Sequence, residues 1–184
     1  ALLNNLMVSG ACVLENSPTH EGYLLDLAER IGPVRDSNFG RLWDVRADID
    51  LAGDAKTNTT ANTGLRLGPH SDLPTRETPP GFQFLHCLIN DADGGASTLT
   101  DGAALVQALE LEYPEAFELL CTRHWIFFNR GPGIDHRWSA PIIDYLPGSD
   151  IPTIRAFYPV RAFPSMAIED VAGCYEALRL FHRM

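Results

Sequence analysis

Residues 67–74 have the sequence LGPHSDLP, which places an imidazole and a carboxylate two positions apart in a short stretch of proline and glycine. In an extended backbone, residues i and i+2 project to the same side. We therefore expect His70 and Asp72 to project together, while Ser71 points the other way. One imidazole beside one carboxylate makes two thirds of a two-histidine, one-carboxylate iron site. The same spacing also suits a His–Asp hydrogen-bonded pair at a turn, and spacing alone leaves both interpretations open.

The segments around this motif predict a mixture of strands and helices. Downstream of it, residues 81–88 alternate between two largely apolar faces, which is typical of a buried strand, and His86 within them is predicted to be a hydrogen-bonded core residue. Upstream, a clear amphipathic helix is expected at about 21–31, ended by a glycine and a proline. Other strands are expected at residues 7–14, 96–100, 125–128, 141–143 and 153–157.

The second half of the chain carries further helix signals. Asp101 is placed to cap a helix that begins near Ala103, and Pro114 occupies the first turn of another. A last helix is expected at about 168–183, with an inner face made by Val171, Ala172, Tyr175 and Leu178. Strands with flanking helices predict a mainly β fold, a sandwich or a barrel with a helical cover.

Composition limits the classes of partner. The chain has 184 residues, which suits one domain, and its net charge is −10, which disfavours nucleic-acid and membrane partners because phosphates are repelled. Its four cysteines are scattered and form no C-x-x-C pair, so we interpret them as reduced thiols of a cytoplasmic protein. No residue pattern decides the assembly state, and a homodimer is kept as a hypothesis.

An ordered set of short motifs carries a family resemblance. The set contains Phe39–Val45, His70–Pro74, Pro79–Cys87, Asp101-Gly102 and Pro114–Phe117. From about Ile31 to the end, the chain resembles the gamma-butyrobetaine and trimethyllysine dioxygenases of the taurine-dioxygenase-like superfamily. The resemblance implies a double-stranded β-helix, or jelly roll, that uses iron(II), 2-oxoglutarate and dioxygen.

The same resemblance assigns the metal site. It implies that His70 and Asp72 are the first two metal ligands and therefore catalytic. It also implies that the third ligand, a histidine, and an arginine for 2-oxoglutarate lie beyond Met184. Residues 1–184 are accordingly expected to be a single catalytic domain that is incomplete at its C-terminus. His182, at the end of the last helix, is a less favoured third ligand.

The substrate expected from the resemblance is a small cationic alkyl compound, with gamma-butyrobetaine of carnitine biosynthesis as the first choice. Phe39 and Trp43 match aromatic residues that surround a trimethylammonium group in relatives, whereas Asn62 stands where relatives have a tyrosine. Tyr158 stands where relatives often have an asparagine near the substrate carboxylate. These departures leave three alternatives open: a trimethyllysine hydroxylase, a hydroxylase of an ammonium-alkyl phosphonate bound by Arg155 or Arg161, and a non-catalytic jelly-roll binding protein.

Overall fold

The structure is a computed structural model, and it describes residues 2–37, 39–45, 67–91, 93–131 and 133–184. The chain divides into two compact units, Ala1–Asp44 with Phe82–Ser97 and Val45–Gly81 with Thr98–Met184, and each is considered by itself. Among the described residues, no helix has the length and apolar character needed to cross a bilayer.

In the first unit, the described residues form the helices α1 (Leu2–Ser9) and α2 (Tyr23–Glu29). Helix α2 confirms the helix expected at about 21–31. The strand expected at residues 7–14 is wrong, because α1 runs through Ser9 and ends where Gly10 adopts a left-handed conformation with φ 69°. A short apolar run has no clear period, so it does not separate helix from strand, and here the preceding leucines extend a helix into it.

The strands expected at residues 81–88 and 96–100 are also absent from the structure. Apolar side chains of the first segment are exposed instead, including Phe82 at 58% and Leu85 at 75%. A strand needs hydrogen-bonding partners on a neighbouring strand, and in the described part of the chain nothing pairs with these residues. The alternating apolar pattern of residues 81–88 therefore does not form a strand here.

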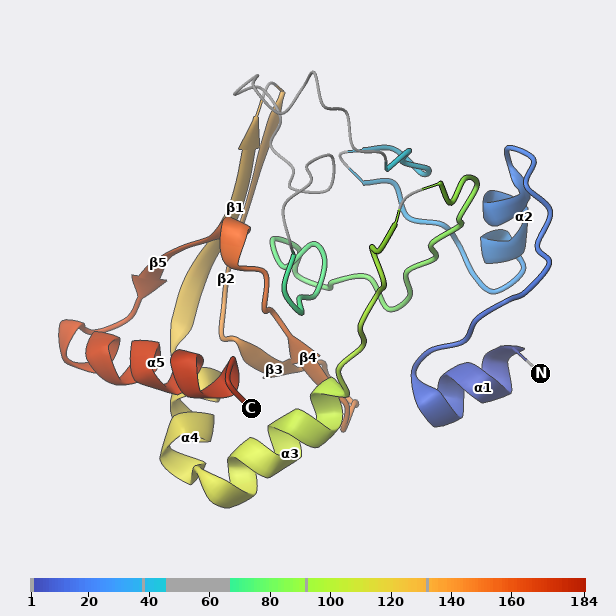
Figure 1. The fold of residues 1–184 in the computed structure, drawn as a ribbon. Helices are drawn as coiled ribbons and strands as arrows, with labels where there is room; N and C mark the ends of the chain where they lie inside the picture. Colours follow the sequence, from blue (N-terminus) through green and yellow to red (C-terminus); the bar gives the residue numbers. More distant parts are fainter. Residues whose placement is uncertain (1, 38, 46–66, 92, 132) are drawn as a thin grey trace. The chain divides into compact units, whose positions relative to one another are not determined.

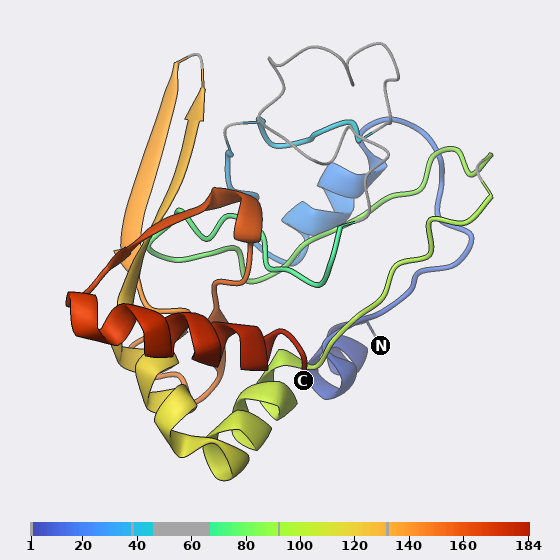
Figure 2. The same cartoon turned by 60° about the vertical axis from the view of Figure 1, so that its left-hand side comes forward.

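The described residues of the second unit form three helices and five antiparallel strands (Figures 1 and 2). Strands β2, β1 and β5 form one sheet in that order, and β3 pairs with β4 in a separate hairpin. The elements follow one another as α3 (Gly102–Glu112), α4 (Pro114–Thr122), β1 (His124–Gly131), β2 (Ile134–Ala140), β3 (Ile143–Tyr145), β4 (Pro152–Ile154), the 3-10 turn η1 (Tyr158–Val160), β5 (Arg161–Ser165) and α5 (Ile168–Phe181).

Local signals set the starts of the helices in this unit. The Asp101 carboxylate accepts a hydrogen bond from the Ala104 amide at 3.0 Å, which confirms it as the N-cap of α3. Pro114 opens α4, where its missing N–H leaves no helical hydrogen bond unmade. Both features depend on residues that are neighbours in sequence, and both are as the sequence predicted.

The core lies where the three helices meet β1 and β3. Its buried side chains include Leu109, Leu120, Trp125, Phe127, Ile142, Ile143 and Phe181. The buried face of α5 is made by Cys174, Ala177, Leu178 and Phe181, at helical spacing i, i+3, i+4 and i+7. The inner face predicted for this helix was therefore rotated: Leu178 is correct, but Tyr175 is 40% exposed.

Strand β2 was not among the predicted strands, and it contains His136. Partly buried and exposed residues alternate along β2 with a period of two, as in a strand with one buried face. The charged residues on the outer face make this pattern hard to recognise in the sequence. The β1–β2 hairpin extends away from the helices (Figures 1 and 2). The antiparallel strands with helical cover are thus confirmed, but helices and strands are mixed rather than mainly β, and the described residues do not close into a barrel.

Candidate metal centre

The side chains of His70 and Asp72 lie together, as their spacing predicted. His70 Nε2 is 3.4 Å from Asp72 Oδ1, and the two side chains are 26% and 38% exposed. Two ligand atoms bound to one ion at about 2.1 Å and at right angles lie about 3 Å apart. The observed separation is therefore close to that of two adjacent ligands on one face of an octahedral ion.

The other nitrogen of the His70 ring decides how the pair can act. Nδ1 lies 2.9 Å from the carbonyl oxygen of Gly68, and a carbonyl can only accept, so Nδ1 carries the proton. In the neutral ring, Nε2 then presents a lone pair towards the carboxylate, which also has only lone pairs to offer. Such an arrangement accommodates a cation between the two groups, and a carbonyl on the second nitrogen is the usual support of a metal-bound histidine.

Ser71 points away from this pair and binds a distant part of the chain. Its hydroxyl donates to the carbonyl of Ile154 at 2.5 Å and accepts from the amide of Ala156 at 3.1 Å. Both partners belong to the backbone at the end of β4 and just after it. The predicted opposite orientation of residue 71 is therefore confirmed, and its role is to attach the motif to this edge.

Phe157 contributes a contact that the sequence did not reveal. Its ring stacks on the His70 imidazole, with centroids 5.0 Å apart and planes inclined by 30°. Phe157 ends the segment that was predicted as a strand over residues 153–157, and β4 (Pro152–Ile154) includes only the first two residues of that segment. The contact depends on how this segment packs beside residues 67–74, so it could not be predicted from the sequence.

Arg155 is a buried cation held by its own chain. Its side chain is 1% exposed; Nη1 donates to Asp144 at 3.1 Å and Nη2 donates to the Glu77 carbonyl at 2.9 Å. A guanidinium so enclosed has no open face for a soluble anion. Arg155 therefore does not fit the phosphonate-binding role considered for it from sequence, and it acts as a structural link instead.

Arg161 and Tyr158 form a second, separate arrangement. The guanidinium of Arg161 lies over the rings of Trp125 and Tyr158, 5.2 and 5.3 Å from their centroids. Burial lowers the pKa of Arg161. Tyr158 is 72% exposed in η1, and it is its neighbour Phe157, not Tyr158, that contacts His70. Nothing here brings Tyr158 to the histidine–aspartate pair.

The first unit holds the predicted aromatic residues Phe39 and Trp43. Their rings are stacked, with centroids 4.0 Å apart and planes within 6° of parallel, and Trp43 is 38% exposed. A tight turn holds Phe39, since its amide donates to the Ser37 hydroxyl at 3.1 Å and Gly40 has φ 84°. Each ring thus has one face against its neighbour. Asn62, the third predicted substrate residue, lies outside the described residues.

Among the described residues, no third metal ligand lies beside His70 and Asp72. No group of three His, Cys, Asp or Glu side chains in this part of the chain is arranged to hold a metal ion. His182 is exposed at the end of α5. The ring of His86 packs against Tyr23 at 5.6 Å and is half-buried. Within the described part of the second unit, His182 does not complete the site.

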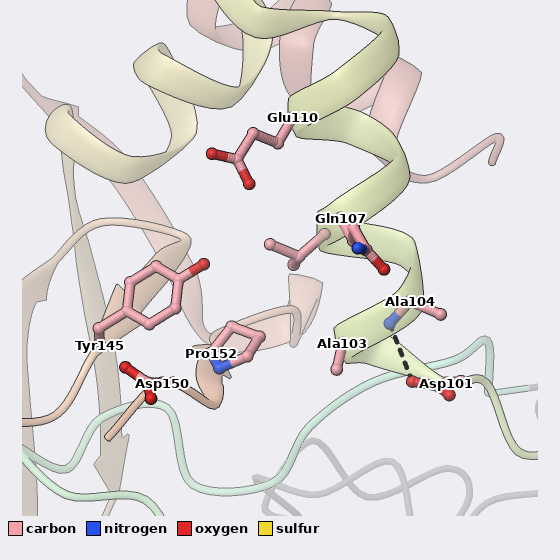
Figure 3. A pocket seen from close by; sticks show the side chains of 9 residues that line it. Asp101, Ala103, Ala104, Gln107, Glu110, Tyr145, Asp150 and Pro152 are labelled. Carbon is pink, nitrogen blue, oxygen red and sulfur yellow. Dashed lines mark hydrogen bonds between the residues drawn. The ribbon is translucent and has the colours of Figure 1, made fainter. Parts of the chain in front are cut away.

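A hollow of about 420 Å³ lies between α3 and the β3–β4 hairpin (Figure 3). The carboxylates of Asp101, Glu110 and Asp150 line it together with the Tyr145 ring, and Glu110 faces Tyr145 across the opening. Asp101 is already engaged as the cap of α3. The hollow is acidic and contains neither member of the histidine–aspartate pair, so it is not part of the candidate metal centre.

Comparison with known proteins identifies the family. The sequence profile described as "Taurine catabolism dioxygenase TauD, TfdA family" matches residues 1–184. The chain belongs to this family. It is 42% identical over 175 residues to gamma-butyrobetaine dioxygenase of Pseudomonas sp. (strain AK-1), covering 95% of the chain and 44% of that relative.

Other members of the TauD/TfdA family are similar over most of the chain. Mouse mitochondrial trimethyllysine dioxygenase is 34% identical over 149 residues, which is 79% of the chain and 34% of that protein. Dioxygenase str8 of Strobilurus tenacellus is 31% identical over 161 residues, covering 88% of the chain and 36% of that protein. The chain therefore spans less than half the length of these relatives.

Proposed function

We propose that the protein to which this chain belongs is an iron(II)- and 2-oxoglutarate-dependent hydroxylase, with His70 and Asp72 as two of its three metal ligands. The observation that carries the proposal is the orientation of His70: Nδ1 is committed to the Gly68 carbonyl, and Nε2 faces Asp72 Oδ1 at 3.4 Å. Membership of a dioxygenase family supports the same assignment.

The residues described here would divide the work as follows. His70 and Asp72 hold the metal, the Gly68 carbonyl keeps the proton on Nδ1, and Phe157 restrains the imidazole plane. Iron(II) with bound 2-oxoglutarate and dioxygen supplies the oxidation by which a C–H bond becomes C–OH. We propose that the third ligand and the 2-oxoglutarate arginine come from a part of the protein outside the described residues, within one catalytic domain of jelly-roll fold.

For the substrate, we propose a small cationic alkyl compound, with gamma-butyrobetaine first. The relative of 42% identity is named for that substrate, and stacked Phe39 and Trp43 rings offer outer faces to a quaternary ammonium. Trimethyllysine is the second candidate, because several relatives are trimethyllysine dioxygenases. The phosphonate alternative is weaker, since Arg155 is already paired with Asp144. A cytoplasmic location and a homodimer remain proposals.

The test is succinate formation by the full-length protein with iron(II), 2-oxoglutarate and a series of substrates. We expect gamma-butyrobetaine to support the highest rate, and His70→Ala and Asp72→Ala each to abolish it together with metal binding. Turnover of 2-oxoglutarate at the wild-type rate in either variant would overturn the ligand assignment. A wild-type protein that binds gamma-butyrobetaine but never forms succinate would be the non-catalytic binding protein instead.

A further inference from the structure

Residues 154–157 form an extended backbone segment, called the 154–157 edge below, and its hydrogen-bonding groups point to two opposite sides. The Arg155 amide donates to the Ile142 carbonyl at 2.8 Å, which joins the segment to the chain just before β3. The Ile154 carbonyl and the Ala156 amide are the groups that bind Ser71. The motif therefore lies along the side of this segment that β3 does not use.

The hydroxyl of Ser71 takes the place of a whole peptide unit in this pairing. It donates to the Ile154 carbonyl at 2.5 Å and accepts from the Ala156 amide at 3.1 Å. In a sheet, the N–H and C=O groups of a neighbouring strand would make these two hydrogen bonds. Two bonds made by one oxygen restrict both sliding and rotation of the motif. Since Ser71 stands between the two ligands, this restriction is transmitted directly to His70 and Asp72.

Two further contacts come from the same edge. The Phe157 ring stacks on the His70 imidazole with centroids 5.0 Å apart, and the Arg155 guanidinium holds the carbonyl of Glu77 at 2.9 Å. The edge thus contacts the motif at His70 and Ser71 and again five residues after Asp72. The ligand pair is held at several points by a segment that contributes no ligand.

We propose that Ser71 is a positioning residue of the metal site, and that its hydroxyl presets His70 and Asp72 on the 154–157 edge before metal binds. This inference rests on the proposed function. Groups that are ordered in advance lose less conformational entropy on binding, so the benefit appears in metal affinity itself. Loss of supporting contacts of this kind typically weakens metal binding about 10–100-fold.

The experiment is an anaerobic titration of the full-length protein with cobalt(II), followed by its visible absorption, without 2-oxoglutarate or substrate. We expect Ser71→Ala to weaken cobalt(II) binding about tenfold or more and to alter the band shape. Ser71→Thr keeps the hydroxyl, so we expect it to stay within about threefold of the wild type.

Ser149→Ala is the matched control. Ser149 also bridges a carbonyl and an amide with one hydroxyl, both on Ile151, at 3.3 and 3.1 Å, but within its own turn. Ser149→Ala removes the same number of hydrogen bonds as Ser71→Ala, but from a more exposed turn. The free energy of unfolding of each variant is therefore measured beside its cobalt(II) affinity, so that a general loss of stability is told apart from a loss at the metal site. Equal affinities for Ser71→Ala and Ser149→Ala would overturn the inference.

The His70→Ala variant separates this inference from the proposed function. If His70→Ala binds cobalt(II) as the wild type does, the metal centre itself is misassigned. If His70→Ala loses binding while Ser71→Ala retains it with an unchanged spectrum, the centre stands and the positioning role of Ser71 is refuted. Weak binding by Ser71→Ala that Ser71→Thr restores supports the proposal.

Discussion

Gly102 lies so close to Ile154 that a Cβ at position 102 would be 2.6 Å from Ile154 Cδ1. The first residue of α3 and the last residue of β4 are therefore in direct contact. The carbonyl of that same Ile154 binds the Ser71 hydroxyl. The start of α3 thus abuts the edge on which the candidate metal ligands rest.

This contact predicts an energetic coupling between positions 102 and 154. Gly102→Ala should change the free energy of unfolding by less than about 1 kcal/mol, because the added methyl group displaces only Cδ1, the flexible end of the Ile154 side chain, and alanine favours the helix over glycine. Ile154→Val removes Cδ1 and by itself should cost about 0.5–1.5 kcal/mol. We expect the double variant to be more stable than the sum of the two changes predicts, as measured by urea unfolding. Strict additivity would show that the two side chains do not compete for the same space.

A second prediction concerns the buried Arg155. Arg155→Met should lower the free energy of unfolding by about 2–4 kcal/mol, since it removes the hydrogen bonds to Asp144 and to the Glu77 carbonyl from an enclosed site. The matched control is Arg137→Met. Arg137 makes two hydrogen bonds to Asp135, but those side chains are 61% and 45% exposed, so its removal should lower the free energy of unfolding much less than the removal of Arg155. Similar losses in both variants would contradict the link that we assign to Arg155.

A third prediction concerns Trp43. Trp43→Ala should raise KM for gamma-butyrobetaine about 2–30-fold, which corresponds to a cation–π contact of about 0.5–2 kcal/mol. The carbon isostere 5,5-dimethylhexanoate, which lacks the ammonium charge, should lose much less affinity in the same variant. Competition binding of both compounds measures the difference, and equal losses would show that Trp43 supplies apolar area rather than a cation site.

The fourth prediction tests Asn62, where relatives have a tyrosine. Asn62→Tyr should improve turnover of gamma-butyrobetaine, because an aromatic face attracts a quaternary ammonium that has no N–H to donate to an amide. Succinate release across gamma-butyrobetaine and its less methylated analogues measures the change. If gamma-butyrobetaine is already the best substrate and the variant gives no gain, Asn62 does not set the preference.

The fifth prediction concerns pH and the half-buried thiol of Cys121. Burial raises its pKa from 9.0 to about 11, with the carboxylates of Glu110 and Asp144 adding to the shift. Above pH 9 the unfolded chain releases this proton while the folded protein keeps it, so stability that is present below pH 9 is lost as pH rises towards 11. Urea unfolding at several pH values should show a smaller decline over this interval for Cys121→Ala. A parallel decline in both proteins would exclude Cys121 as the cause.

The sequence by itself determined the features that depend on neighbouring residues. The Asp101 cap, the start of α4 at Pro114 and the shared side of His70 and Asp72 all follow from local backbone geometry. Periodicity also located β1 and the extent of α5, although the buried face of α5 was predicted about one position away from where it lies. A free helix has no fixed rotation, and only the neighbours that it packs against choose its inner face.

Tertiary structure alone decided what supports the ligands and which apolar runs become strands. Ser71 and Ala156 are 85 residues apart in sequence, and no local pattern predicts that the Ala156 amide donates a hydrogen bond to the Ser71 hydroxyl. The alternating pattern of residues 81–88 likewise does not make a strand by itself. A helix satisfies its backbone hydrogen bonds within one segment, whereas a strand needs a neighbouring strand. An alternating apolar segment therefore becomes a strand only where the tertiary structure places such a neighbour beside it.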